Sequence, residues 1–366
     1  MAASTRLSHV DGEAGQLTLA GYAVEDLAPR ASFEEVAYLF LHGRLPAPAE
    51  RVAFARDLAE RRALPRAAVE ILREAAAAKA PPMDALRMAA SLLGLGREEN
   101  PLDDAITAIA SFPTVVGVYW RLHNGETPVP IRSDLPHAAH YLHQLSGAEP
   151  TPERARALET YLNTVCDHGL NASTFTARVI VSTRSDVISA ITGAVGALKG
   201  PLHGGAPGPA LDMVFAIGTP ERADTVIRAK LDRGERLMGF GHRVYRVRDP
   251  RADVLAQTAE RFYSNGGDRS LYDLARSVEA TALRLLRERK PDRRLDTNVE
   301  FYTALLLHGL GLPVELFTPT FAVGRVLGWA AHCLEQLRDG RLIRPQSAYI
   351  GPVGLHYHRP PVSAAS

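Results

Sequence analysis

Three histidines stand out as residues that could do chemistry. His168 closes an apolar helical stretch, His203 lies in the run GPLHGGA, and His242 lies in the run MGFGHRVY. None has another histidine or a cysteine at the spacing of a zinc site, so we do not expect a metal. A lone histidine is usually a surface or core residue, and a glycine pair can be a plain turn. The glycines beside His203 and His242 nevertheless favour a site, because glycine lets the backbone approach a ligand closely.

Arginines form the second group. Four of them fall between residues 243 and 251, and the planar guanidinium donates a bidentate fork that suits phosphates and carboxylates. The alternative is a solvated basic face paired with Asp249 and Asp253. Arg325 is different because it lies within an apolar helical stretch. A guanidinium there is costly unless an anion or a carboxylate meets it.

One carboxylate completes the set. Glu300, in the run NVEFY, heads another apolar helical stretch. Its simplest role is a favourable interaction with the helix N-terminus.

Helices must position these residues. Apolar residues recur at helical spacing almost throughout, most clearly over residues 158–166, 274–285 and 323–337. Alternating runs of strand length are hard to find. The stretch 178–182 could pass for a strand, but it lies inside a longer helical pattern. The sequence therefore predicts an all-α protein.

Proline and glycine suggest how the chain is divided. Dense groups at residues 204–209 and 311–313 bracket a stretch long enough for a small domain. We expect a small helical domain at 208–312, inserted into a large helical domain made of 1–207 and 313–366. The tail from Pro360 to Ser366 is predicted to be disordered.

The overall charge favours no nucleic-acid or membrane partner. Among 366 residues there are 42 Lys plus Arg and 41 Asp plus Glu, so anion binding must come from local arginine clusters. These arginines also lack the interleaved aromatic residues that stack on bases. The two cysteines are expected to be buried free thiols in a reducing compartment. The N-terminus lacks a signal-peptide pattern, and no membrane span is expected, so we predict a cytoplasmic protein.

Together, the motifs resemble the citrate synthase family in its compact bacterial form. The match runs through DHGLNASTFTARV, GALKGPLHGGAP, MGFGHRVYRVRDPRA, NVEFYTALLL, FTPTFAVGRVLGWAAHCLEQ and LIRPQSAYIGP, with weaker agreement towards the N-terminus. The resemblance implies a homodimer of α-helical subunits, in which the small domain closes over the substrate. It implies an acyltransferase of the tricarboxylic acid cycle that condenses acetyl-CoA with oxaloacetate and needs no cofactor.

The resemblance also implies roles for the residues above. His168 and His242 would hydrogen-bond oxaloacetate, and His242 would polarise its ketone. Three arginines would bind the two carboxylates: Arg251, Arg325 and, donated by the partner subunit, Arg344.

The resemblance also implies which residues would activate and bind the acyl-CoA. The methyl group next to the thioester is a weak carbon acid, so a base and an enolate stabiliser must act together. Glu300 would remove the proton, and a neutral His203 would donate to the thioester carbonyl oxygen. Arg246 would bind a phosphate of CoA. The rest of CoA would lie along the backbone of Arg236, Leu237, Met238, Gly239 and Phe240.

The sequence departs from the family pattern at Glu300, the residue expected to act as the catalytic base. The usual motif is NVDF, and the extra methylene of Glu300 moves the carboxylate by roughly 1.5 Å if the backbone stays in place. Misplacement by about 1 Å can cost about 10²-fold in rate, so we expect the backbone or rotamer to compensate. Smaller departures at Gly169, Ala20 and Pro81 concern local packing and substrate preference.

Two alternatives stay open. A 2-methylcitrate synthase would use propionyl-CoA, and one methylene changes discrimination by only about 1–3 kcal/mol. A non-catalytic relative that binds oxaloacetate or CoA would be supported only by Glu300.

Overall fold

The computed structural model describes residues 3–204, 207–242, 244–245, 247–265, 268–291, 293 and 295–357. Most of this part of the chain is helical, which confirms the predicted all-α class. The strands are β1 (Ser8–Asp11), β2 (Gln16–Leu19) and β3 (Tyr22–Ala23). The α helices are α1 (Val24–Leu27), α2 (Phe33–His42), α3 (Pro48–Glu60), α4 (Arg66–Ala77), α5 (Pro82–Ala90), α6 (Pro101–His123), α7 (His137–Ser146), α8 (Pro152–Val165), α9 (Ala172–Val181), α10 (Val187–Leu198), α11 (Pro207–Ile217), α12 (Ala223–Asp232), α13 (Pro250–Ser264), α14 (Arg269–Arg289), α15 (Val299–Gly309) and α16 (Phe317–Asp339). Short 3-10 turns precede α12 (η1, Pro220–Arg222) and α16 (η2, Val314–Leu316).

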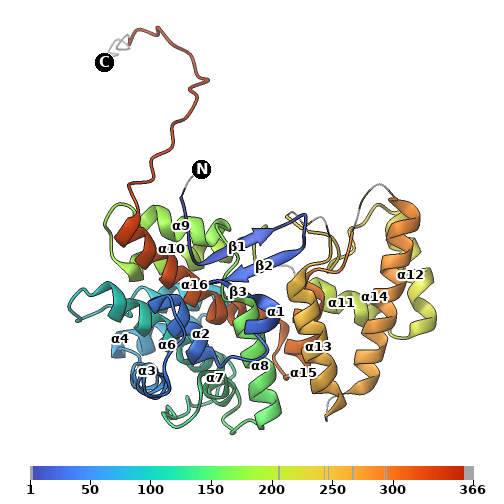
Figure 1. Ribbon diagram of the computed structural model, residues 1–366, viewed down its shortest axis with the longest axis horizontal. Helices are drawn as coiled ribbons and strands as arrows, with labels where there is room; N and C mark the ends of the chain where they lie inside the picture. The colour runs from blue at the N-terminus through green and yellow to red at the C-terminus, as the bar shows by residue number, and fades with distance from the viewer. Residues whose placement is uncertain are drawn as a thin grey trace, which may run out of the picture.

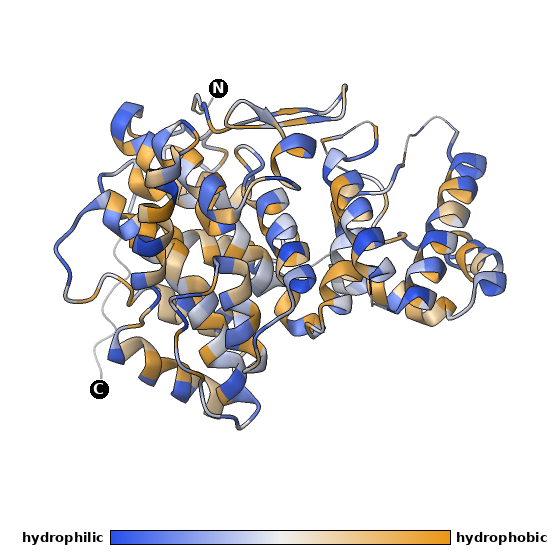
Figure 2. Ribbon diagram, turned by 60° about the horizontal axis from the view of Figure 1, so that its bottom comes forward, coloured by the Kyte–Doolittle hydropathy of each residue, from blue (hydrophilic) through white to orange (hydrophobic). Residues whose placement is uncertain are grey.

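The centre of the larger helical group is α16, which packs against α6, α8, α9 and α10 (Figure 1). All the apolar positions from Val323 to Ala331 are buried, as the helical period over 323–337 predicts. The helices predicted over 158–166 and 274–285 correspond to α8 and α14, and residues 178–182 lie at the end of α9 rather than in a strand. Figure 2 shows apolar residues gathered along the inner faces of the helices.

The helix α6 corrects one expectation. It contains an 18-residue window that is long and apolar enough to cross a membrane, although no such stretch was expected. That window is 83% buried inside the protein. A helix that is apolar on all sides and buried against α16 is part of the protein's core.

A small sheet was not anticipated. Strands β1, β2 and β3 form an antiparallel sheet in which Ser8 pairs with Leu19 and Leu19 with Tyr22. Leu17 and Leu19 are buried beneath it. Strands this short carry too few residues for an alternating pattern to be recognised. The sheet brings Ser8 to the loop that follows α8, where its hydroxyl bonds to Asp167 and Gly169.

Figure 1 shows α11, α12 and α14 at one end of the molecule and most of the larger group at the other. The helix α11 begins at Pro207, so the proline–glycine group at 204–209 is partly helical. The division into domains at 208 and 312 stays a prediction. Both cysteines are free and buried, as predicted, and burial raises the pKa of Cys333 to about 12.

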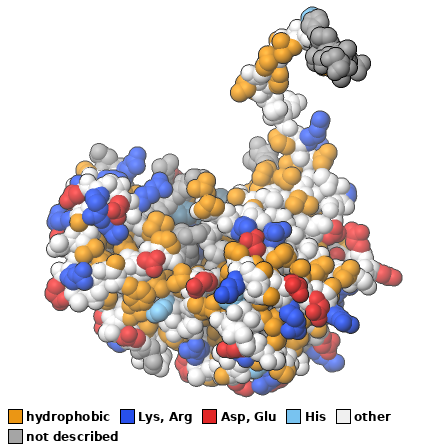
Figure 3. Space-filling view, turned by 180° about the vertical axis from the view of Figure 1, so that it is seen from behind, with side chains coloured by type: hydrophobic (Ala, Val, Ile, Leu, Met, Phe, Trp, Pro, Cys, Tyr) orange, Lys and Arg blue, Asp and Glu red, His pale blue; other side chains and the backbone are white. Residues whose placement is uncertain are grey.

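After α16 the chain leaves the body of the protein. Residues 340–357 form no helix or strand and extend outward (Figure 1). Their apolar side chains project into solvent, as Figure 3 shows; Ile350 is 97% exposed and Tyr357 86%. Apolar side chains in such numbers are normally covered by another surface. The predicted disorder of residues 360–366 lies outside the described residues.

Candidate active site

The loop that carries His242 is tied to the segment before α15. The N–H of Gly241 donates to the carbonyl of Asp296 (2.8 Å), and the N–H of Asn298 donates to the carbonyl of Gly239 (3.0 Å). Because α15 begins at the next residue, these bonds bring His242 close to the start of that helix.

Glycine is needed on both sides of Phe240. Gly239 and Gly241 have φ angles of +88° and +79°, in the left-handed region that side chains disfavour. A Cβ atom at Gly239 would also lie 3.0 Å from the Cβ of Phe301. A larger residue would therefore push the loop away from α15.

The tautomer of His242 follows from its neighbours. Its Nδ1 accepts hydrogen bonds from the backbone N–H groups of Val244 and Tyr245, both at 3.0 Å. The neutral ring must then carry its proton on Nε2. Burial lowers the pKa of His242 to about 4, and the charge of Arg251 adds to this. The side chain is therefore a neutral donor at physiological pH.

His168 and Arg251 both lie close to the ring of His242. The rings of His168 and His242 are 5.8 Å apart, and His168 Nε2 lies 3.1 Å from the hydroxyl of Tyr245. A guanidinium nitrogen of Arg251 lies 3.5 Å from His242 Nε2. Burial, and then Arg251, lower the pKa of His168 well below its ordinary value. The predicted oxaloacetate ligands His168, His242 and Arg251 are thus brought together.

Asp249 fixes Arg251 in this place. It accepts two bonds from the guanidinium, at 3.0 and 2.8 Å, and it caps α13 by accepting from the Arg251 N–H. Asp249 also accepts a hydrogen bond from the N–H of Val299, at 3.3 Å. One buried carboxylate therefore connects Arg251 with the start of α15.

The other arginines of this stretch have different surroundings. Arg248 forms ion pairs with Asp253 (2.5 Å) and Glu279 (2.9 Å). This agrees with the alternative interpretation, in which the arginines are paired with nearby carboxylates. Arg243 and Arg246 lie outside the described residues, so the predicted phosphate contact of Arg246 stays a prediction.

Arg325 is buried in α16 with 1% exposure. Its Nε donates to the carbonyl of Val165 at 2.7 Å, and it forms no ion pair with a carboxylate in the part of the chain that the structure describes. Burial lowers its pKa to about 10, so it is still charged near neutral pH. A buried cation of this kind is suited to bind an anion.

Glu300 lies in the first turn of α15 and is half-buried. The side-chain oxygen of Asn298 accepts its backbone N–H at 3.0 Å, which leaves the carboxylate free of a capping role. Burial raises the pKa of Glu300 to about 7, and the charge of Arg251 limits the rise. A carboxylate with this pKa can take up and release a proton at neutral pH.

His203 is held by two residues that the sequence analysis missed. Its Nε2 lies 3.3 Å from the N–H of Ser173 and 2.8 Å from the Ser173 hydroxyl. That hydroxyl in turn accepts from the indole N–H of Trp329 at 3.0 Å. Since a backbone N–H donates to Nε2, the neutral ring carries its proton on Nδ1. Burial, together with Arg325, lowers the pKa of His203 to about 4.

A cavity of about 460 Å³ opens beside His242. It is lined by the predicted CoA segment from Arg236 to Phe240 and by Lys290 and Arg293, which the sequence analysis did not single out. The side chains of Arg236, Lys290 and Arg293 are exposed, and none of them forms an ion pair within the described ranges. The basic run RERKPDRR could have drawn attention to the last two.

Arg344 lies elsewhere. It belongs to the extended C-terminal segment, is exposed, and lines a second cavity with residues of the N-terminus. The structure therefore does not place it beside His242 of the same subunit. In the described residues, no group of three or more His, Cys, Asp or Glu side chains could hold a metal ion.

Known proteins share this arrangement of sequence and fold. The family model described as citrate synthase, C-terminal domain, matches residues 1–346. The chain belongs to the citrate synthase family. A relative named citrate synthase 2 from Bacillus subtilis is 43% identical over 92% of this chain and 90% of its own length. A 2-methylcitrate synthase from Shewanella oneidensis is 40% identical over 96% of this chain and 92% of its own.

A solved member of the family has the same fold. The citrate synthase from Thermoplasma acidophilum, described as a ternary complex with carboxymethyl coenzyme A and oxaloacetate, is similar with a TM-score of 0.86 and 30% identity. The match covers 98% of this chain and 96% of that one. The predicted family and fold class are confirmed.

Proposed function

We propose that this citrate synthase family member condenses acetyl-CoA with oxaloacetate and hydrolyses the product to citrate and CoA. The observation that carries the proposal is the pair of donors at His242 Nε2 and Arg251. The buried Arg325 is near enough for its charge to act on both Arg251 and Glu300. A small dianion with a ketone has acceptors for all three. The Thermoplasma relative, which is described with oxaloacetate bound, supports this choice.

Oxaloacetate binding uses the positive charges first. Arg251 and Arg325 take the carboxylates, and His168 and His242 donate to oxygens of the same molecule. Because both histidines have lowered pKa values, they act as neutral donors that impose direction without adding charge. His242 Nε2–H stabilises the ketone oxygen as it becomes an alkoxide.

Condensation then needs a carbanion equivalent from the acyl group. The Glu300 carboxylate takes a proton from the methyl carbon, while His203 donates from Nδ1 to the thioester oxygen. The resulting enol carbon bonds to the ketone carbon of oxaloacetate, and the former ketone oxygen receives a proton through His242. Water then cleaves the thioester, which releases CoA and the new carboxylate.

CoA occupies the cavity beside His242. The backbone from Arg236 to Phe240 follows its length, and Lys290 and Arg293 provide positive charge for its phosphates. Arg246 is a further phosphate contact. We place the moving small domain at 208–312, against a large domain of 1–207 and 313–366. Its closure keeps water from the thioester until condensation is complete.

The active enzyme is a homodimer in which the Arg344 side chain reaches the partner's oxaloacetate site. This is supported by the exposed position of Arg344 and by the uncovered apolar side chains of residues 340–357, which a second subunit would cover. No cofactor beyond the two substrates is needed, and the enzyme acts in the cytoplasm.

Propionyl-CoA is the alternative acyl donor. The observation in its favour is the 40% identity with the Shewanella 2-methylcitrate synthase, close to that of the relative named citrate synthase 2. The condensation chemistry and the residues are the same for both donors.

The decisive experiment measures CoA release from acetyl-CoA and propionyl-CoA with oxaloacetate present or absent, and identifies the acid formed. We expect release only with oxaloacetate, and a higher kcat/KM for acetyl-CoA. A higher value for propionyl-CoA would assign the 2-methylcitrate reaction. No release from either donor would leave only the non-catalytic binding role.

A further inference from the structure

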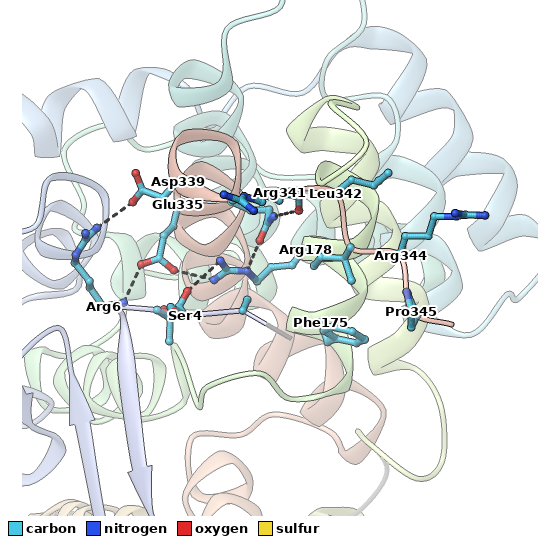
Figure 4. Close-up of a pocket in the computed structure, with 15 residues that line it drawn as sticks. Ser4, Arg6, Phe175, Arg178, Glu335, Asp339, Arg341, Leu342, Arg344 and Pro345 are labelled. Atoms are coloured by element: carbon cyan, nitrogen blue, oxygen red, sulfur yellow. Dashed lines mark hydrogen bonds and ion pairs between the residues drawn. The ribbon is translucent and has the colours of Figure 1, made fainter. Parts of the chain in front are cut away.

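A network of buried polar residues leads from the ends of the chain to the residue before His168. It starts at the cavity of about 750 Å³ that the N-terminal residues, α9 and the end of α16 enclose (Figure 4). Arg178 lies on its wall and is only 2% exposed. Its guanidinium donates to Glu335 (2.7 Å) and to Gln336 (2.9 Å).

The network continues inward through His332. An Arg178 nitrogen lies 2.9 Å from His332 Nδ1, and His332 Nε2 lies 3.1 Å from Asp167 Oδ2. Because the guanidinium can only donate, the proton of His332 is on Nε2 and is directed to Asp167. Both His332 and Asp167 are fully buried.

Ser8 holds the loop on both sides of His168. Its hydroxyl donates to Asp167 Oδ2 (2.5 Å) and accepts from the N–H of Gly169 (2.8 Å). Ser8 belongs to β1, so the N-terminal sheet holds the Asp167 carboxylate before His168 and the Gly169 N–H after it.

The helix α16 holds the same loop from the other side. The N–H of Gly328 donates to the carbonyl of Cys166 at 3.1 Å. A Cβ atom at Gly328 would lie 2.7 Å from Asp167 Oδ1, so the loop can approach the helix only because this residue is glycine. Arg325 and His332 belong to the same helix. The helix therefore fixes the position of the loop relative to these two side chains.

We propose that Asp167, held by His332 and Ser8, is a positioning residue that orients the His168 imidazole for oxaloacetate. The inference rests on the proposed function. Burial raises the pKa of Asp167, but the neighbouring His332 lowers it below its ordinary value, so the carboxylate stays ionised as an acceptor for both donors. None of these network residues lines the cavity beside Lys290 and Arg293.

Ser8→Ala tests this most cleanly, because it removes both hydroxyl bonds from a half-buried position without opening a large cavity. We expect the KM for oxaloacetate to rise about tenfold or more, with kcat and the KM for acyl-CoA within twofold of the parent. The Kd of oxaloacetate, measured by calorimetry, should rise in parallel. Ser189→Ala is the control, because it removes a serine bond to an aspartate, Asp186 (2.6 Å), in the first turn of α10, which carries none of the proposed site residues; its kinetics should equal the parent's.

His332 provides the second test. His332→Ala should raise the oxaloacetate KM at least as much as Ser8→Ala, and His332→Gln, which keeps a donor, should restore part of the affinity. Parent values for oxaloacetate in Ser8→Ala, or equal changes in both substrates' KM values, would overturn the inference. If His332→Ala does not fold, Ser8→Ala decides alone. A parent protein that neither binds oxaloacetate nor releases CoA would instead overturn the proposed function.

Discussion

His242 Nε2 and the guanidinium of Arg251 lie 3.5 Å apart, and both are hydrogen-bond donors. They cannot satisfy each other, because Nδ1 of His242 already accepts two backbone N–H groups. Two fixed donors at this separation need an acceptor between or above them, and a ligand oxygen can provide it. The chemistry proposed for the site follows from this relationship.

Arg325→Gln should weaken oxaloacetate binding far more than it weakens the fold. Truncating a buried charge that meets a ligand carboxylate costs about 2–5 kcal/mol, so the KM for oxaloacetate should rise by about 10² or more. The unfolding temperature should stay equal or increase, because the substitution removes a buried cation that has no carboxylate ion-pair partner among the described residues. Thermal unfolding without substrates and steady-state kinetics check both parts. A large loss of stability with an unchanged KM would assign Arg325 to the fold instead.

The pH dependence of kcat/KM should follow the ionisation of the Glu300 carboxylate. Its pKa is raised to about 7, so the carboxylate needed as a base disappears as pH falls through that value. The kcat/KM for acetyl-CoA should therefore fall about tenfold for each pH unit below 7, while His203 and His242, with pKa values of about 4, add no limb above pH 5. Glu300→Gln should lower kcat by about 10²–10⁴ and remove this limb. Full activity in Glu300→Gln would show that another group is the base.

Lys290→Ala and Arg293→Ala should each raise the KM for acyl-CoA by about two- to fivefold, with oxaloacetate unaffected. Exposed charges contribute little individually, and the effect should shrink as ionic strength rises. Kinetics at low and high salt measure both features. Arg66→Ala, at the start of helix α4, is the matched control, because its side chain is likewise exposed and forms no ion pair within the described residues. An equal effect in Arg66→Ala would show that only the net charge of the protein matters.

Mixing two inactive variants tests whether Arg344 acts across the dimer. Arg344→Ala and Glu300→Gln should each be nearly inactive alone. In a hybrid dimer, one site combines an intact Glu300 with the partner's intact Arg344. After 1:1 dissociation and reassociation, activity should return to roughly a quarter of the parent's. If Arg344 served its own subunit, no site in the hybrid would be complete and mixing would restore nothing.

The sequence by itself determined the helical class and the family. The 3.6-residue spacing of apolar residues is a local property, so α8, α14 and α16 could be predicted with their buried faces. The glycine-flanked histidines, Arg251, Arg325 and Glu300 were also recognisable, because unusual residue types in apolar or glycine-rich runs need no coordinates to be noticed. Their roles stay predictions.

Only the tertiary structure decided how these residues are held. Ser8 and Asp167 are 159 positions apart, and Trp329 and Ser173 are 156 apart, so no local pattern connects them. The tautomer of His203 and the ion pair between Arg248 and Glu279 depend on contacts of the same kind. So does the position of Lys290 and Arg293 beside the cavity that Arg236 also lines. Hydrogen bonds and charge pairs act over a few ångströms in space, and distance along the chain does not reveal which groups will meet.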